Sequence, residues 1–207
     1  MKYSKYLLAI LCLVIANVVT AQDESDSKFK FIAYGGIGYG IVNNDDEADY
    51  NLNSNTAELL LYYKFNEKYG VATGVGLNEL TGNGFSTLGE FYHQRDFIKI
   101  PLLFTYDYGF SDTFKVYGNL GPYAQGIIKD EYRFVDTVVE DVFEGWNFGF
   151  QLSLGLLFQV SDRFSTGINF TGQSDFTKLE SNSGSGLEDK QRMRNLNTFG
   201  LLFMFDL

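Results

Sequence analysis

Residues 146–160, WNFGFQLSLGLLFQV, alternate between large apolar side chains and small or polar ones over fifteen positions. Trp146, Phe148 and Phe150 begin the apolar series, which continues without a break to Val160. The positions between them are small or polar, with Leu157 as the exception. Because successive side chains of a β-strand point to opposite faces, this period of two predicts a strand with one apolar face and one polar face.

Other parts of the chain repeat this period, some of them only in part. They are residues 31–42, 57–65, 71–78, 95–107, 114–128, 164–171 and 198–207. Together with residues 146–160 they predict eight strands. Most of these segments are longer than the five or six residues usual in soluble sheets, and their length suits a tilted crossing of a bilayer.

Two all-β folds produce strands of this kind. In a soluble β-sandwich the apolar faces point inward, whereas in a transmembrane barrel they contact lipid and the small, polar faces fill the lumen. The polar faces here are rich in Gly, Ser, Asn and Gln, and the apolar faces are rich in large aromatic residues. This composition favours an eight-stranded antiparallel up-and-down transmembrane β-barrel, with the sandwich as the alternative.

The predicted connections alternate in length along the chain. Three are short, at 66–69, 108–113 and 161–163. Four are long and polar, at 43–55, 81–94, 129–145 and 175–194. The series begins and ends with a long connection, which is typical of an eight-stranded outer-membrane barrel with both termini in the periplasm.

The beginning of the chain has the pattern of a secretory leader. Lys2 and Lys5 precede an apolar run at 7–16, and small residues follow up to Ala21. This run is about half of the roughly 20 residues that a membrane-spanning helix needs. We predict a signal peptide at residues 1–21, a short periplasmic segment at 22–30 and the barrel at 31–207. Cys12, the sole cysteine, falls in the leader, so the mature chain is expected to form no disulfide.

The composition fits a single β domain. The 207 residues include 20 Phe, 14 Tyr and 22 Gly but 2 Pro, and no linker divides them. Aromatic residues favour strands, and glycine weakens helices. The formal net charge of −10 argues against a nucleic-acid partner.

The middle of the chain carries a recognisable series of short motifs. Residues 100–103 read IPLL, Tyr108-Gly109 follows, and residues 116–118 and 121–123 read VYG and GPY. This stretch, residues 97–126, resembles the PorT-like outer-membrane β-barrel family. The resemblance implies an eight-stranded barrel in the outer membrane of Bacteroidota-type bacteria, with some relatives linked to protein secretion machinery and no catalytic motif to carry over. Leu207 stands where such barrels more often end in an aromatic residue.

Several charged residues fall at strand positions that the predicted registers turn inward. They are Glu58, Lys64, Arg95, Lys99 and Asp107. A charge facing lipid near the midplane costs several kcal/mol, so we expect these residues to pair inside the lumen. In a barrel this narrow they predict a packed polar core rather than a selective pore.

Aromatic residues lie near several predicted strand ends, and we interpret the lipid-facing ones as interfacial anchors. The aromatic residues in question, of which only the members that face lipid are expected to be anchors, are Trp146, Tyr62, Tyr63, Tyr106, Tyr108, Tyr117, Tyr123 and Tyr132.

The sequence offers little for catalysis. His93, the single histidine, falls in the predicted loop 81–94 with Glu90 and Asp96 nearby. One histidine with loop carboxylates is a poor metal site, and nothing in the sequence orients Ser86 as a nucleophile. We therefore interpret His93 as a solvated loop residue.

An acidic segment is the remaining candidate for ligand binding. It comprises Asn43, Asn44, Asp45, Asp46, Glu47 and Asp49. Clustered oxygen ligands suit calcium, but the segment lacks the turn glycine and the closing glutamate of a calcium-binding loop. We favour a solvated anionic loop and expect no metal, cofactor or catalytic residue.

These observations predict a non-enzymatic integral outer-membrane barrel with a structural or docking role in the cell envelope. Its expected partners are outer-membrane lipid and lipopolysaccharide, the barrel-assembly machinery during insertion, and an envelope or secretion-system protein. A barrel that binds or transports a small ligand is the alternative, and a membrane-embedded lipid hydrolase is a more distant one.

Overall fold

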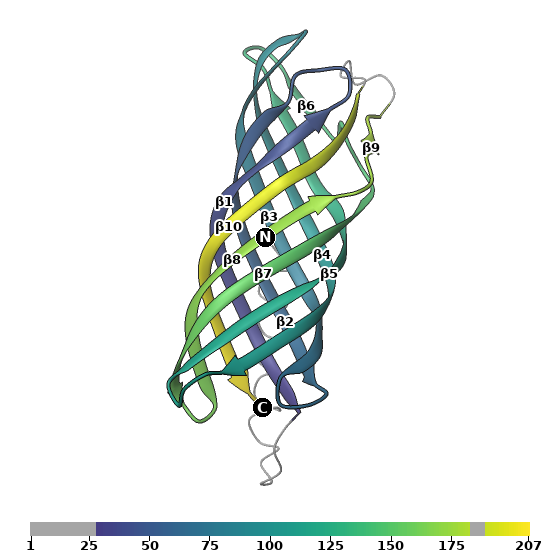
Figure 1. The fold of residues 1–207 in the computed structure, drawn as a ribbon. Helices are drawn as coiled ribbons and strands as arrows, with labels where there is room; N and C mark the ends of the chain where they lie inside the picture. Colours follow the sequence, from purple (N-terminus) through teal and green to yellow (C-terminus); the bar gives the residue numbers. More distant parts are fainter. Residues whose placement is uncertain (1–27, 183–188) are drawn as a thin grey trace, which may run out of the picture.

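The computed structural model describes residues 28–182 and 189–207 and has the form of a closed antiparallel β-barrel (Figure 1). Eight long strands form the wall: β1 (Phe29–Asn44), β2 (Tyr50–Lys64), β3 (Tyr69–Ser86), β4 (Gly89–Gly109), β5 (Phe114–Arg133), β7 (Trp146–Ser161), β8 (Phe164–Asp175) and β10 (Lys190–Asp206). Each long strand pairs with the next, and β1 pairs with β10 to close the sheet. The predicted eight-stranded barrel is confirmed.

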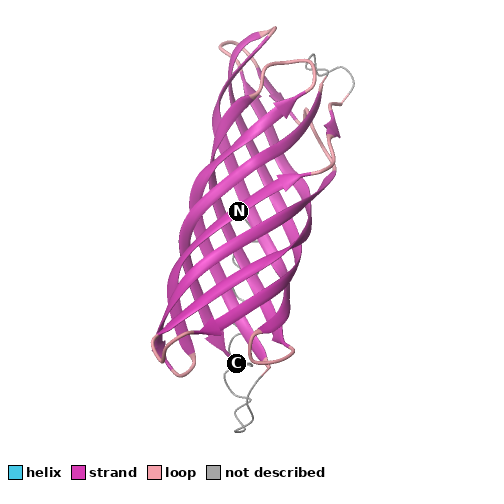
Figure 2. Ribbon diagram, viewed as in Figure 1, coloured by secondary structure: helices cyan, strands magenta, loops and turns pink. Residues whose placement is uncertain are grey.

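Little besides the strands is present in the described part of the chain (Figure 2). The short strands β6 (Val138–Glu140) and β9 (Leu179–Glu180) pair with β5 and β10. No helix in the described ranges is long and apolar enough to cross a membrane. The predicted signal peptide lies outside the described residues, and so do residues 22–27 of the predicted periplasmic segment.

The apolar faces of the strands point outward. Ile37 on β1, Leu154 on β7 and Phe199 on β10 are 71%, 63% and 54% exposed. The residues between such positions are buried inside the barrel, as Ser153 and Thr198 illustrate. A soluble sandwich would show the opposite arrangement, so this alternative is excluded.

The outward apolar surface forms a band of the height expected for a membrane barrel. Between Phe29 and Tyr39, β1 rises about 25 Å along the barrel axis, at ~3.3 Å per residue and a tilt of about 40°. Outer-membrane barrels carry an apolar band of about 25 Å. Exposed aromatic residues border this band, among them Phe65 and Phe158 at one edge and Tyr39 and Trp146 at the other.

The two ends of the barrel differ. The start of β1 and the end of β10 lie together at the lower end in Figure 1, where the backbone N–H of Leu207 donates to the Phe29 carbonyl. We call this the terminal end and the opposite one the distal end. At the distal end β3, β4 and β5 remain paired well beyond the apolar band, and β4 extends over 21 residues.

This extension corrects the predicted connections. The segment 81–94 is mostly strand, and Thr87 and Leu88 alone lie between β3 and β4. The strict alternation of short and long connections is therefore wrong. Beyond the lipid band both faces of a strand can be polar, because water borders the outer face, and the alternation of apolar and polar residues fades there although the strand continues.

Candidate functional site: the lumen and the distal pocket

The lumen contains layers of paired charges, and the first lies at the terminal end. Lys30 Nζ on β1 lies 2.6 Å from Asp107 Oδ2 on β4 and 3.0 Å from Asp206 Oδ1 on β10. Lys30 and Asp107 are both buried. The strand β1 begins two residues before the predicted segment, which is why Lys30 was not among the expected lumen residues.

A second layer lies farther along the lumen and joins four strands. Lys99 Nζ on β4 forms an ion pair with Glu58 on β2, and it donates to Gln151 Oε1 and Gln173 Oε1 at 2.7 Å each. Lys99 is completely buried. A buried ammonium group needs both a counter-charge and further acceptors, and this layer supplies them.

The third layer, near the distal end, centres on Asp130 of β5. Its Oδ1 accepts hydrogen bonds from Arg95 Nε at 2.6 Å and from His93 Nε2 at 2.8 Å. Its Oδ2 accepts the backbone N–H of Phe143 at 2.9 Å. Arg95 also donates to Gln191 Oε1 on β10 at 3.0 Å, so the layer reaches across the lumen.

His93 is not the solvated loop residue that we predicted. It lies on β4 with 0% of its surface exposed, and its ring stacks on Tyr132 with ring centroids 4.0 Å apart. With Nε2 donating to the Asp130 carboxylate, Nδ1 accepts from the Tyr50 hydroxyl at 2.9 Å. The prediction failed because the segment 81–94 is strand, which turns His93 into the lumen.

Apolar clusters separate and cover these layers. The first cluster, nearest the terminal end, is made of Ile32, Tyr34, Leu60, Tyr62, Ala72, Leu103, Tyr117, Leu157, Leu202 and Met204. The second is made of Val42, Leu52, Leu80, Phe97, Met193 and Leu196. A third, at the distal end, is made of Phe91, Tyr132, Val142, Phe143 and Leu179. The lumen is thus a packed core of polar layers and apolar clusters, whereas we predicted a packed polar core.

The predicted inward charges agree with this arrangement. Glu58, Arg95, Lys99 and Asp107 are buried in the three layers, and each has the opposite charge beside it. Lys64 lies half-buried at the terminal end of β2. Asp130 was missed because it fell in the predicted connection 129–145, whereas it lies on β5, where a bulge opposite the Asp96–Phe97 step turns it inward.

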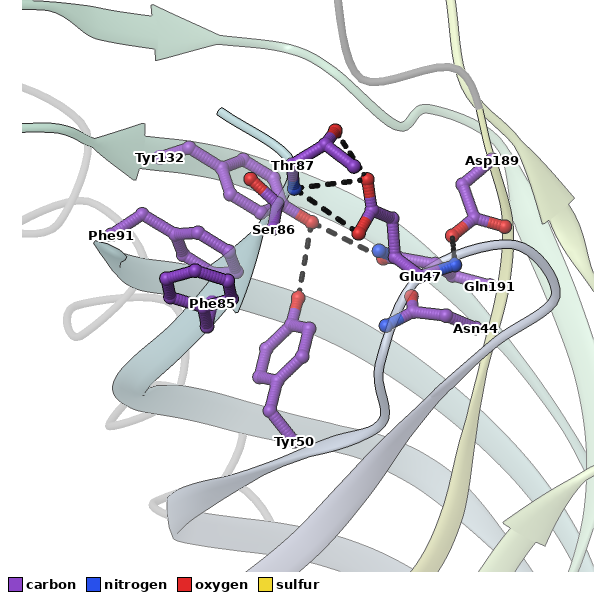
Figure 3. Close-up of a pocket in the computed structure, with 10 residues that line it drawn as sticks. All are labelled: Asn44, Glu47, Tyr50, Phe85, Ser86, Thr87, Phe91, Tyr132, Asp189 and Gln191. Atoms are coloured by element: carbon purple, nitrogen blue, oxygen red, sulfur yellow. Dashed lines mark hydrogen bonds between the residues drawn. The ribbon is translucent and has the colours of Figure 1, made fainter. Parts of the chain in front are cut away.

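A pocket of about 300 Å³ lies at the distal mouth, next to the third layer (Figure 3). Ten residues line it: Asn44, Glu47, Tyr50, Phe85, Ser86, Thr87, Phe91, Tyr132, Asp189 and Gln191. The hydroxyls of Tyr50 and Tyr132 lie 3.2 Å apart, and Tyr132 also donates to Gln191 Oε1 at 3.2 Å. The pocket combines aromatic faces with hydroxyl and amide groups.

The acidic segment borders this pocket, and hydrogen bonds hold both its backbone and the carboxylates of Asp49 and Glu47. Asp189 accepts the N–H groups of residues 45, 46 and 47 at 3.0 to 3.2 Å. Asp49 accepts the N–H of Asn44 at 2.9 Å, and Glu47 accepts from the Thr87 hydroxyl at 2.7 Å. In the described part of the chain no three His, Cys, Asp or Glu side chains converge as metal ligands would.

The chain matches a known family over nearly its whole length. Residues 8–204 fit the model of the outer membrane protein beta-barrel domain. The chain belongs to this family. As an outer-membrane barrel, it resides in the outer membrane of a bacterium. A comparison with curated protein sequences gives no match.

Two bacterial outer-membrane proteins are among the solved structures with the fold of this barrel. The outer membrane protein OprG from Pseudomonas aeruginosa is 17% identical, with a TM-score of 0.54 over 90% of this chain and 100% of OprG. Neisserial surface protein A is 11% identical, with a TM-score of 0.52 over 89% of this chain and 100% of its own. At these identities the likeness shows the fold alone.

Proposed function

We propose that this outer-membrane barrel is a non-enzymatic protein that docks another component of the cell envelope through its distal end. In this proposal the distal end faces the cell exterior, and both termini lie in the periplasm. The resemblance of residues 97–126 to PorT-like barrels supports a link to protein secretion machinery.

The observation that carries the proposal is an apolar tip on the part of the wall that extends beyond the lipid band. Leu88, in the β3–β4 turn, and Val135, in the β5–β6 turn, are 57% and 94% exposed. Phe85 and Val138 beside them are also exposed. The tip lies beyond the lipid band, so lipid does not cover these side chains, and exposed apolar patches of this kind typically mark protein contacts.

The lumen argues against a transport function. Three layers of paired charges and three apolar clusters fill it from Lys30 to Phe143. Eight-stranded barrels have interiors that side chains can fill, whereas porins, whose lumen is a water-filled channel, have about twice as many strands. A closed lumen leaves the ends of the barrel as the surfaces through which it acts.

The site at the distal mouth also argues against a hydrolase. His93 is the single histidine of the chain, so a serine-based mechanism would need it as the general base. Both of its ring nitrogens are engaged, however, by Tyr50 and by Asp130. Ser86 lies in the pocket and its hydroxyl accepts the N–H of Leu88. A catalytic serine needs a free ring nitrogen of its histidine as general base, and this arrangement offers none.

Binding of a small ligand at the distal mouth is the second candidate. The pocket beside Tyr50 and Tyr132 favours it, because aromatic faces with convergent hydroxyl and amide groups are typical of ligand sites. A ligand there would contact the same end of the barrel as a docked protein.

Site-specific photocrosslinking in intact cells tests the docking proposal. A photoreactive residue replaces Leu88 or Val135 at the tip, and Leu154 in the lipid band serves as the control. The proposal expects one adduct of the same discrete mass from both tip positions and none from Leu154. Adducts from Leu154 as well, or no adduct from either tip position, would contradict docking through this end.

A further inference from the structure

Some of the cationic side chains on the outer wall near the distal end form ion pairs with carboxylates of the protein, and others do not. Lys129 and Arg133 on β5 both contact the carboxylate of Glu131. Lys178 pairs with Asp45, and Lys190 pairs with Glu180. Within the described ranges, Arg192 and Arg194 are the outward-facing cations of this region that contact no carboxylate.

Arg192 and Arg194 lie on the same face of β10, at the edge of the lipid band. Arg194 pairs with Ile41 of β1, and Asn197, farther toward the terminal end, pairs with Tyr39. Tyr39 is one of the exposed aromatic residues that border the band. The two guanidinium groups therefore lie at the depth of lipid headgroups rather than of acyl chains.

The side chain of Arg192 is held in place by its neighbour on β1. Its Nε donates to Asn43 Oδ1 at 3.1 Å, and Asn43 in turn donates through Nδ2 to Asp49 at 3.0 Å. The terminal nitrogens of the guanidinium group remain available to an external acceptor. Arg194 is exposed, and its side chain forms no hydrogen bond with any described residue.

Neutral hydrogen-bonding groups extend this surface onto the next strand. Asn51 and Asn53 on β2 are exposed, and they pair with Ile41 and Tyr39. The next two strands carry carboxylates instead, because Glu79 of β3 pairs with Asn55 of β2 and with Asp96 of β4. In a chain with a net charge of −10, cations and amides are thus gathered at one side of the headgroup region.

We propose that Arg192 and Arg194 form a binding site for the phosphate groups of an anionic glycolipid in the adjoining leaflet. Guanidinium groups bind phosphate oxygens in bidentate geometry, and the asparagine amides suit sugar hydroxyls. This inference rests on the proposed orientation of the barrel at one point, because that orientation places the site in the outer leaflet. In that leaflet lipid A is the phosphorylated glycolipid. Binding in micelles does not depend on that orientation, so the two can fail separately.

Calorimetric titration of the refolded barrel with bisphosphorylated lipid A in nonionic micelles tests the proposal. The double variant R192Q/R194Q is expected to raise the Kd by about 30-fold. The matched double variant K129Q/R133Q removes the same charge, and it is expected to change the Kd by no more than about threefold because Glu131 already pairs those cations. Both variants should keep the heat-dependent gel shift of a folded barrel.

Titrations with dephosphorylated lipid A and with inorganic phosphate distinguish binding of a lipid phosphate group from binding of a free anion. Dephosphorylated lipid A is expected to bind the unaltered barrel as weakly as R192Q/R194Q binds lipid A. Equal losses in the two double variants, or undiminished binding of the dephosphorylated lipid, would overturn the proposal. Inorganic phosphate with the affinity of lipid A would assign the site to a free anion instead. If R192Q/R194Q does not refold, R194Q alone is expected to weaken binding about fivefold.

Discussion

Arg95 Nε and Asp130 Oδ1 lie 2.6 Å apart inside the barrel, on directly opposite positions of β4 and β5. Both side chains are buried, and His93 and the Phe143 N–H complete the hydrogen bonding of the carboxylate. This ion pair closes the lumen beneath the distal pocket, so its removal should affect the stability of the distal half most.

Replacing Asp130 by asparagine should destabilise the barrel by about 3–5 kcal/mol, because Arg95 would stay buried without its counter-charge. Reversible urea unfolding of the barrel in vesicles measures this free energy. Asp136→Asn, at an exposed position of the β5–β6 turn, provides the control and should change it by less than about 0.5 kcal/mol. Equal effects at the two positions would show that the buried pair contributes nothing.

An arginine at Leu154 should reduce the free energy of unfolding by about 2–4 kcal/mol, because this side chain faces lipid in the middle of the band. An arginine at Asn83, on the outer face of β3 beyond the band, should reduce the free energy of unfolding by about 0–1 kcal/mol. Unfolding in vesicles again supplies the measurement. If Leu154→Arg were as mild as Asn83→Arg, the assignment of the lipid-facing surface would be wrong.

Gly149 on β7 provides the space for the ring of Tyr123 on β5. A Cβ at Gly149 would lie 2.4 Å from the Tyr123 ring, whose hydroxyl donates to Asp175 at 2.7 Å. Gly149→Val should therefore displace Tyr123 and destabilise the barrel by about 1–3 kcal/mol. The double variant G149V/Y123A should be less unstable than the sum of the single variants, and strict additivity would contradict the steric explanation.

Labelling of intact cells tests which end faces outward. Because Cys12 lies in the predicted leader, Leu88→Cys would give the mature chain one thiol at the distal tip, and Glu67→Cys would give one at the terminal end. A membrane-impermeant maleimide should label Leu88→Cys in intact cells and Glu67→Cys only after lysis. The reverse pattern would show that the distal end faces the periplasm.

The lipid-facing part of the fold could be predicted from the sequence, because in that region water and lipid act on opposite faces of each strand. The segment 146–160 shows this most clearly, since every second residue from Trp146 to Val160 is apolar and exposed on the outer wall. The alternation of apolar and polar residues is weaker in β4 and β5, which carry the IPLL and GPY motifs. Their pairing was nevertheless predicted from the short connection between them.

The distal site could not be predicted in the same way. Beyond the band, polar side chains occupy both faces of β3 and β4, so His93 was assigned to a loop although it is buried on a strand. The bulge at Ile128 changes which residues of β5 face inward, and local alternation contains no sign of it. The pocket needs contributions from strands far apart in sequence, as the contact between Tyr132 and Gln191 shows.

Single-channel recording on the refolded barrel in planar bilayers tests most directly whether the lumen is closed. With the charge layers around Lys30, Lys99 and Arg95 in place, we expect no discrete conductance steps at voltages that leave the bilayer intact. Reproducible ohmic steps from the unaltered protein would mean that a continuous water path crosses these layers. The barrel would then act as a pore, and the filled lumen could no longer be used as an argument against a transport function.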